Sequence, residues 1–136
     1  MAAYCLDTNV ISDVMAGEPK TLARLEAARK TSSTFISVIV RGEVLHGIGR
    51  LADGKRKANL LQKANKLLAV IPCEPLVAEI ADEFARIKTD AQRRGLSLTD
   101  NDLWIAATSL IHNATLVTRD GDFSRGAWTA VENWAA

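Results

Sequence analysis

Hydrophobic and polar positions follow two different periodicities along the chain, and these predict its strands and helices. Short runs of apolar, β-branched and aromatic residues predict strands, because such side chains fit a pleated, half-buried surface. We expect strands at residues 4–6, 34–38, 70–72, 115–118 and 128–131. Longer stretches with apolar residues at three- and four-residue spacing predict amphipathic helices. We expect helices at residues 10–15, 19–30, 39–51, 55–69, 75–94 and 100–112.

Strands and helices alternate throughout, which predicts the α/β class, with a mostly parallel sheet covered by helices on both faces. Gly95 is the expected stop of one long helix, and Thr99 or Asp100 the expected cap of the next. Leu22 and Leu25 are expected to face inward from their helix. The apolar stripe expected on helix 55–69 consists of Leu60, Leu61, Leu67 and Leu68.

Composition places the chain among globular proteins. It has 136 residues, of which 48% are hydrophobic and 24% charged, and its formal net charge is +1. These values exclude a disordered chain and suit one domain over residues 1–136. Near-neutrality argues against a protein that binds nucleic acid by bulk charge alone. The average nevertheless hides a pattern, because residues 1–18 carry −3, residues 19–66 carry +8 and residues 67–136 carry −4.

The sequence predicts a cytoplasmic protein with no membrane segment. No N-terminal basic region precedes an apolar stretch, so no secretory signal is expected. The longest uncharged run, residues 103–118, has 16 residues, which falls short of the roughly 18 that a membrane span needs. Cys5 and Cys73 have apolar neighbours and no metal-type spacing, so both are expected to be buried thiols.

Acidic residues stand where the predicted strands end. Asp7 follows the first strand, and Asp120 and Asp122 follow the strand at 115–118. Asp102 lies in the first turn of a helix, on its inward face, and Glu43 lies in the helix after the second strand. Ligands of parallel sheets bind outside the carboxyl ends of the strands, so we expect these acids to converge.

Carboxylates gathered in one pocket repel one another and require a cation. Oxygen ligands in an open pocket favour Mg²⁺ or Mn²⁺, and two such ions about 4 Å apart would activate a water for attack on a phosphodiester. Each acid also has a local alternative. Asp7 is suited to an ordinary N-cap, Asp102 to a capping box with Thr99, and Glu43 to solvent exposure. Asp120 and Asp122 are suited to a turn around Gly121.

Four segments resemble the acidic motifs of PIN-domain nucleases, in order and over essentially the whole chain. They are Leu6–Ser12, Val40–Gly47, Asp102–Thr108 and Leu116–Phe123. Their spacing and the chain length resemble the VapC toxins of bacterial toxin–antitoxin pairs, including the FitB-like branch.

This resemblance implies a three-layer α/β/α fold with a five-stranded parallel sheet. It also implies a Mg²⁺- or Mn²⁺-dependent endoribonuclease, a homodimer, and inhibition by a VapB-like antitoxin. Carried over by position, Asp7 and Asp102 would be the principal metal ligands, with Glu43 beside them and Asp120 or Asp122 as the fourth acid. The expected supporting residues are Thr8, Asn9 and Thr118.

Partners are predicted from charge and apolar stripes. Bases of the middle segment are candidates to contact RNA phosphates, chiefly Arg41, Arg50, Lys55 and Lys57. The stripes of helices 10–15, 22–30 and 39–70 suit a partner helix, although packing on the sheet requires the same stripes. By analogy, an antitoxin arginine is expected to reach into the carboxylate pocket.

Two rival interpretations stay open at this point. In an aspartate-nucleophile phosphoryl-transfer domain, Asp7 would be the nucleophile. Such domains have a second aspartate two positions later or a lysine after a late strand, where this chain has Asn9 and Arg119. The other rival is a non-catalytic PIN-like domain that binds partners, and its mark would be the loss of one or more acids.

Overall fold

The computed structural model describes residues 2–136, and its centre is a five-stranded sheet in the order β3-β2-β1-β4-β5. All four neighbouring pairs are parallel. The strands are β1 (Ala3–Leu6), β2 (Ser33–Ser37), β3 (Cys73–Glu74), β4 (Thr115–Val117) and β5 (Val131–Glu132). β1 is central, with Cys5 paired to Phe35 of β2 on one side and to Leu116 of β4 on the other.

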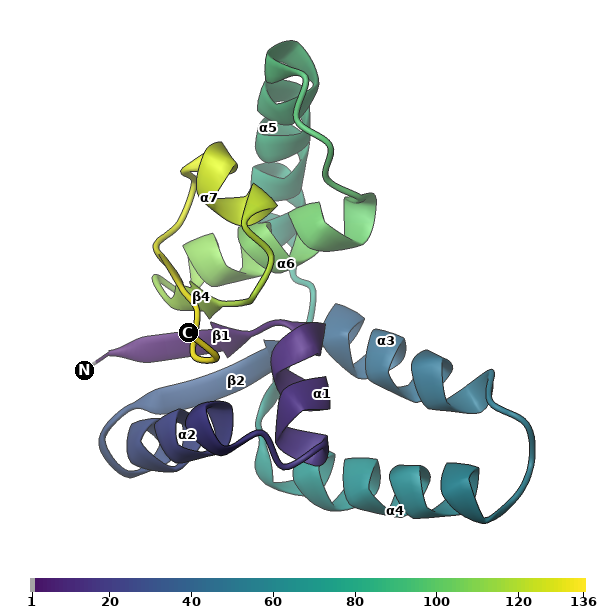
Figure 1. The fold of residues 1–136 in the computed structure, drawn as a ribbon. Helices are drawn as coiled ribbons and strands as arrows, with labels where there is room; N and C mark the ends of the chain where they lie inside the picture. The colour runs from purple at the N-terminus through teal and green to yellow at the C-terminus, as the bar shows by residue number, and fades with distance from the viewer. Residues whose placement is uncertain (1) are drawn as a thin grey trace.

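Helices connect the strands and cover both faces of the sheet. They are α1 (Thr8–Met15), α2 (Pro19–Thr31), α3 (Val38–Gly49), α4 (Lys55–Val70), α5 (Ala78–Arg94), α6 (Asp100–Ile111) and α7 (Asp122–Gly126). Figure 1 shows α5, α6 and α7 on one side of the strands and α2, α3 and α4 on the other. α1 packs against α2, α3 and α4. The expected three-layer α/β/α fold is therefore confirmed.

The core lies between the sheet and these helices. β1 contributes Cys5 and Leu6, both fully buried, because strands of a parallel sheet are covered on both faces. α6 is buried along most of its length, since it packs on β1 and β4 beneath α5. Within residues 2–136, no helix is both long and apolar enough to cross a membrane.

Several predicted elements are displaced in the structure. The strand expected at 70–72 is wrong, because α4 continues through Val70 and the paired strand is Cys73–Glu74. The helix expected from residue 75 begins at Ala78, and the final strand is Val131–Glu132 rather than 128–131. The loop expected after β4 contains the short helix α7.

Two predicted burials are also wrong. Leu61 is 40% exposed, because it lies off the face of α4 that holds the buried Ala64 and Leu68. Cys73 is only half-buried, since β3 is the edge strand of the sheet. Burial raises the pKa of both cysteine thiols, and at Cys5 the charge of Asp7 acts in the same direction.

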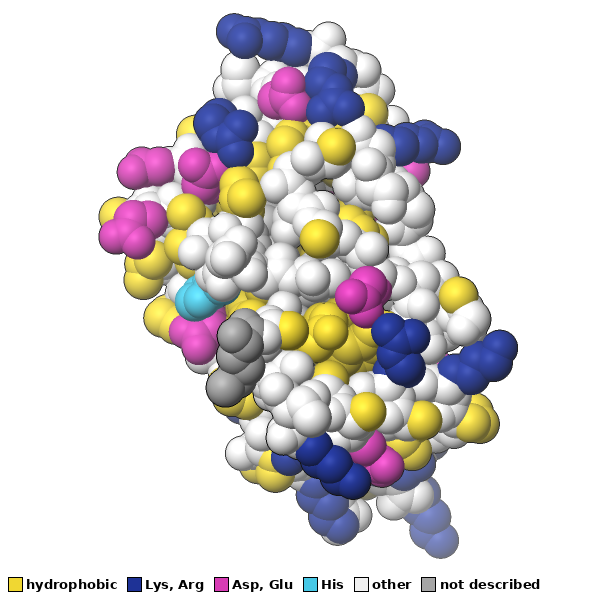
Figure 2. All heavy atoms as spheres, turned by 90° about the vertical axis from the view of Figure 1, so that its left-hand side faces the viewer, with side chains coloured by type: hydrophobic (Ala, Val, Ile, Leu, Met, Phe, Trp, Pro, Cys, Tyr) yellow, Lys and Arg dark blue, Asp and Glu magenta, His cyan; other side chains and the backbone are white. Residues whose placement is uncertain are grey.

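The end of the molecule at which the strands begin does not show a surface of a single charge. Figure 2 views this end, and acidic, basic and hydrophobic side chains lie interspersed on it. The acidic residues that follow the strands lie at the opposite end of the sheet, where the strands finish.

Candidate active site

The strand order reverses direction between β1 and β4, and the acidic residues gather there. From β1 the chain progresses to β2 and β3 on one side, and then to β4 and β5 on the other. Such a switch point leaves a crevice outside the carboxyl ends of the two central strands. Asp7 directly follows β1, and Thr118 directly follows β4.

Asp7 is the most buried acid of this crevice, at 6% exposure. It is the N-cap of α1, and its Oδ1 accepts a hydrogen bond of 2.8 Å from the backbone N–H of Thr8. Its Oδ2 accepts from the Thr118 hydroxyl at 2.8 Å. Asp7 is therefore both the N-cap of α1 and an acid at the carboxyl end of β1.

Asn9 connects the two strand ends. Its amide nitrogen donates to Asp7 Oδ2 at 3.3 Å and to the Thr118 hydroxyl at 3.0 Å. Its amide oxygen accepts from the backbone N–H of Arg119 at 3.1 Å. Asn9 and Thr118 therefore fix the Asp7 carboxylate from the side of β4, as expected for supporting residues.

Glu43 is half-buried on α3 and is held by two neighbours. The Thr8 hydroxyl donates to its Oε1 at 2.7 Å, and the Asn101 amide donates to its Oε2 at 3.4 Å. The local alternative, an acid directed only to solvent, is therefore wrong. Asn101 comes from the first turn of α6, so Glu43 bridges the two layers of helices.

Asp102 lies at the start of α6 and forms a capping box with Thr99. The Thr99 hydroxyl accepts from the Asp102 N–H, and Asp102 Oδ2 accepts from the Thr99 N–H, both at 3.2 Å. Thr99, rather than Asp100, is the cap. Asp100 is exposed and pairs with Lys88 at 2.9 Å.

Asp120 interacts with the other acids of the crevice, whereas Asp122 pairs with a neighbouring arginine. The Asp120 N–H donates to the Thr118 hydroxyl at 3.0 Å, and its negative charge helps to raise the pKa of Asp102. Asp122 begins α7 and pairs with Arg125 at 3.4 Å. The Asp122 N–H donates to Asp120 Oδ1 at 2.9 Å, so the expected turn is present as well.

The pKa values show the electrostatic cost of the cluster. Burial raises the pKa of Asp7 to about 6, against the lowering effect of its bonds from Thr118 and Thr8. The charges of Asp102 and Glu43 contribute to this raised pKa. Burial, Asp120 and Glu43 also raise the pKa of Asp102. A bound cation would reverse these shifts, because it favours the charged form.

The residues fit a hard divalent cation in their chemistry. All four clustered acids supply oxygen atoms, and their mutual repulsion calls for positive charge. Across residues 2–136, no three His, Cys, Asp or Glu side chains form a group that could hold a metal ion by themselves. Mg²⁺ does not require such a cage, because it usually binds through one or two carboxylates, waters and substrate phosphates.

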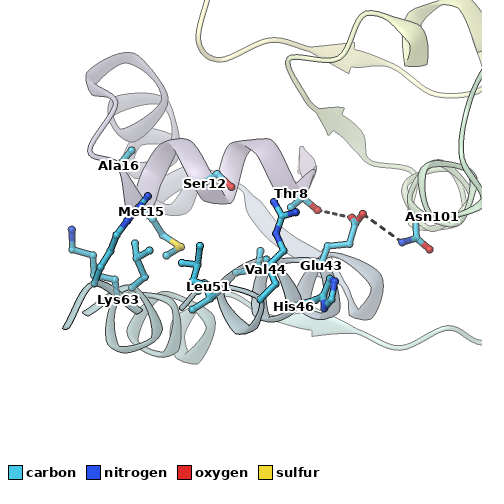
Figure 3. A pocket seen from close by; sticks show the side chains of 15 residues that line it. Thr8, Ser12, Met15, Ala16, Glu43, Val44, His46, Leu51, Lys63 and Asn101 are labelled. Atoms are coloured by element: carbon cyan, nitrogen blue, oxygen red, sulfur yellow. Dashed lines mark hydrogen bonds between the residues drawn. The ribbon is translucent and has the colours of Figure 1, made fainter. Parts of the chain in front are cut away.

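A groove runs from this cluster along α1, α3 and α4 (Figure 3). Its volume is about 710 Å³. Thr8, Glu43 and Asn101 line one end, as Figure 3 shows. The apolar lining includes Met15, Val44, Leu51 and Leu60, and the basic residues of the lining are Arg50, Arg56 and Lys63.

The four cations predicted to contact RNA differ in their surroundings. Arg50 lines the groove, whereas Arg41 and Lys55 are exposed outside its lining. Lys57 donates to the Gly49 carbonyl and to Asp53, each at 3.0 Å. Arg56 and Lys63, which belong to the same basic middle segment and are candidates for the same contact, line the groove as well.

The sequence motifs do not indicate two further contacts of the site, the Asn101–Glu43 bond and the Asp13–Arg119 ion pair. Asn101 carries no charge and stands one residue before an acid, so only the fold shows its bond to Glu43. Asp13 pairs with Arg119 at 2.8 Å beside the cluster. Their separation along the sequence left no spacing signal that could have connected them.

Comparison with known proteins agrees with the fold. Residues 4–128 match the PIN domain, so the chain belongs to the PIN-domain family. It is 29% identical over 133 residues to ribonuclease VapC2 of Rickettsia felis, covering 96% of this chain and 97% of that protein. It is 30% identical over 136 residues to toxin FitB of Neisseria gonorrhoeae, covering 94% and 95% respectively.

Solved structures show the same similarity. The Rickettsia felis VapBC2 complex, bound to a DNA fragment from its promoter, contains a chain that matches with a TM-score of 0.88 and 28% identity. The match covers 97% of this chain and 98% of that one. FitAcB of Neisseria gonorrhoeae matches with a TM-score of 0.80 and 28% identity over 96% and 97%. The predicted family is confirmed.

Proposed function

We propose that the chain is a cytoplasmic, Mg²⁺- or Mn²⁺-dependent endoribonuclease, the toxin of a toxin–antitoxin pair. The observation that carries this proposal is the acid cluster of Asp7, Glu43, Asp102 and Asp120 at the sheet switch point. The names of the relatives, ribonuclease VapC and toxin FitB, support RNA as the substrate and the toxin role.

The residues of the site have two proposed roles: some would hold the metal, and others orient the carboxylates. Asp7 and Asp102 would hold the metal, with Glu43 and Asp120 close enough to add charge or to orient a bound water. Thr118 and Asn9 hold the Asp7 carboxylate in one orientation, and Thr8 and Asn101 do so for Glu43. Fixed donors of this kind reduce the reorganisation needed during the reaction.

When bound, a divalent ion supplies Lewis acidity to the scissile phosphate and lowers the pKa of a coordinated water. The chain's contribution is a set of oriented carboxylates whose mutual repulsion a nearby positive charge would relieve. RNA phosphates would contact the basic side chains that line the groove, Arg50, Arg56 and Lys63.

Removal of divalent metal is expected to abolish cleavage. Purified protein incubated with RNA and Mg²⁺ or Mn²⁺ should produce internal cuts, and excess EDTA should remove them, because the acid cluster repels phosphate without a cation. Gel analysis of a 5′-labelled RNA measures this, with re-addition of Mn²⁺ as the control. Cleavage that resists EDTA, or none with either metal, would refute the proposed function.

The groove is the proposed site of a VapB-like partner. Part of its lining is apolar, which suits one face of an amphipathic protein segment. Its acidic end would receive a cationic side chain of the partner beside Glu43. Similar solved structures are of VapBC2 and of FitAB bound to DNA fragments, which supports such a partner.

Leu51→Glu is expected to weaken partner binding by at least about tenfold, since it places a charge on the apolar wall of the groove. The matched control is Leu61→Glu, because Leu61 is 40% exposed and lies outside this groove. Titration calorimetry with the partner from the neighbouring small gene measures the difference. Equal affinities of the two variants would exclude the groove as the partner site.

We also propose that the active form is a homodimer, as the family implies. Analytical ultracentrifugation of the chain without its partner tests this: a mass near twice 14.7 kDa is expected.

A further inference from the structure

We propose that Arg119 and Asp13 are positioning residues, whose ion pair holds the loop that carries Asp120 against the helix that begins after Asp7. The inference rests on the proposed function, because it assigns these residues a part in the same site. Neither residue belongs to the acid cluster, and their role follows from four contacts in the structure.

The first contacts attach Arg119 to α1 at two points. Its backbone N–H donates to Asn9 Oδ1 at 3.1 Å, and its side-chain Nε donates to Asp13 Oδ2 at 2.8 Å. Residues four apart lie on the same face of a helix, so Asn9 and Asp13 form one row on α1. A single residue of the loop therefore spans a full turn of the helix.

The other contacts connect Arg119 to the acids on both sides of the crevice. It stands between Thr118, whose hydroxyl donates to Asp7, and Asp120, whose N–H donates to that same hydroxyl. Movement of Arg119 relative to α1 would shift both neighbours. The pair therefore sets where Asp120 lies relative to Asp7.

The ion pair also keeps a cation away from the carboxylates. Arginine pairs readily with carboxylate groups through its planar fork of donors, and four acids lie close to this loop. Asp13 has a side chain only 17% exposed, and it holds the Arg119 guanidinium on the α1 side. Without Asp13, the guanidinium would be free to turn toward Asp120 and occupy the place of the metal.

A purely stabilising role would leave a different signature. Although Asp13 is mostly buried, the Arg119 side chain is 48% exposed, so solvent screens the pair and its contribution to stability is modest. A positioning role instead predicts a loss of activity and metal affinity with little change in thermal stability. The two roles are therefore separable by experiment.

The test compares Asp13→Asn, Arg119→Gln and the double variant with the unmodified chain. Each single change is expected to lower kcat and to weaken Mn²⁺ affinity by about tenfold, the effect typical of residues that orient metal ligands. KM should stay within about twofold and Tm within about 3 °C. The double variant should have a kcat and a Mn²⁺ affinity no lower than those of the less active single variant. Asp13→Glu should retain most of the activity.

Mn²⁺ affinity is read from the electron paramagnetic resonance signal of the free ion, which does not depend on cleavage. The matched control is Arg24→Ala, which breaks an exposed ion pair of 3.0 Å to Glu132 elsewhere and should leave Mn²⁺ affinity and kcat unchanged.

Three results would overturn the proposal: additive losses in the double variant, a Tm that falls in step with activity, or an Arg119 defect with full activity of Asp13→Asn. The last would mean that Arg119 contacts the substrate directly. If the unmodified chain cleaves no RNA, the proposed function fails, yet the Mn²⁺ affinities still decide whether the pair positions the acids.

Discussion

Asp7→Asn is expected to reduce RNA cleavage by at least about 10²-fold, the largest effect of any single substitution in the site. The change removes the charge that would hold the metal, and metal stabilisation of a transition state amounts to several kcal/mol. Asparagine keeps the N-cap acceptor toward Thr8, so the helix start is preserved. Single-turnover cleavage of a labelled RNA at saturating Mg²⁺ measures the loss.

Asp100→Asn is the matched control for this experiment. Asp100 lies in the first turn of α6, is exposed and pairs with Lys88, so its neutralisation should leave cleavage within about twofold, as for most surface substitutions. Full activity of Asp7→Asn would remove Asp7 from the metal site. Equal losses in both variants would indicate a general effect of charge rather than a specific ligand.

Asp7 is expected to make the metal-free protein less stable as the pH rises from about 4 to about 6. Folding raises the pKa of Asp7 from 3.8 to about 6, so in this window the folded state binds more protons than the unfolded state. The free energy of unfolding should therefore fall, by about 3 kcal/mol if Asp7 acted alone. Asp102, whose pKa is also raised, acts in the same direction.

Urea unfolding in EDTA at several pH values measures this effect for the unmodified chain and for Asp7→Asn. The variant should be the more stable of the two above about pH 6, and the difference should vanish below about pH 4. Added Mg²⁺ should raise the Tm of the unmodified chain and have little effect on the variant. A difference that does not change with pH would contradict the burial of a charged Asp7.

Periodicity predicted most of the fold, because helices and strands with one buried face impose a repeat on the sequence. Periodicity did not predict the positions of the two-residue strands or the short helix after β4. β3 and β5 are too short to show alternation, and their positions depend on pairing with β2 and β4. α7 was missed because five residues around Gly121 resemble a turn.

The acids of the site were predictable because parallel strands place their carboxyl ends at one edge. The different surroundings of Asp120 and Asp122 were not, since they depend on how the loop folds: the Asp120 N–H donates to Thr118, and Asp122 pairs with Arg125. Asn101 and the Asp13–Arg119 pair were equally hidden, because contacts across 58 and 106 residues leave no local pattern.

The bond between Thr118 and Asp7 spans 111 residues, and this separation has a consequence during synthesis. β1 can pair with β2 once residue 37 has been made, but its other edge has no partner until β4 follows. Asp7 then lacks Thr118, and Asp120 does not yet exist. The site of Asp7, Thr118 and Asp120 is therefore completed only when residues 115–120 have been translated and have folded against β1.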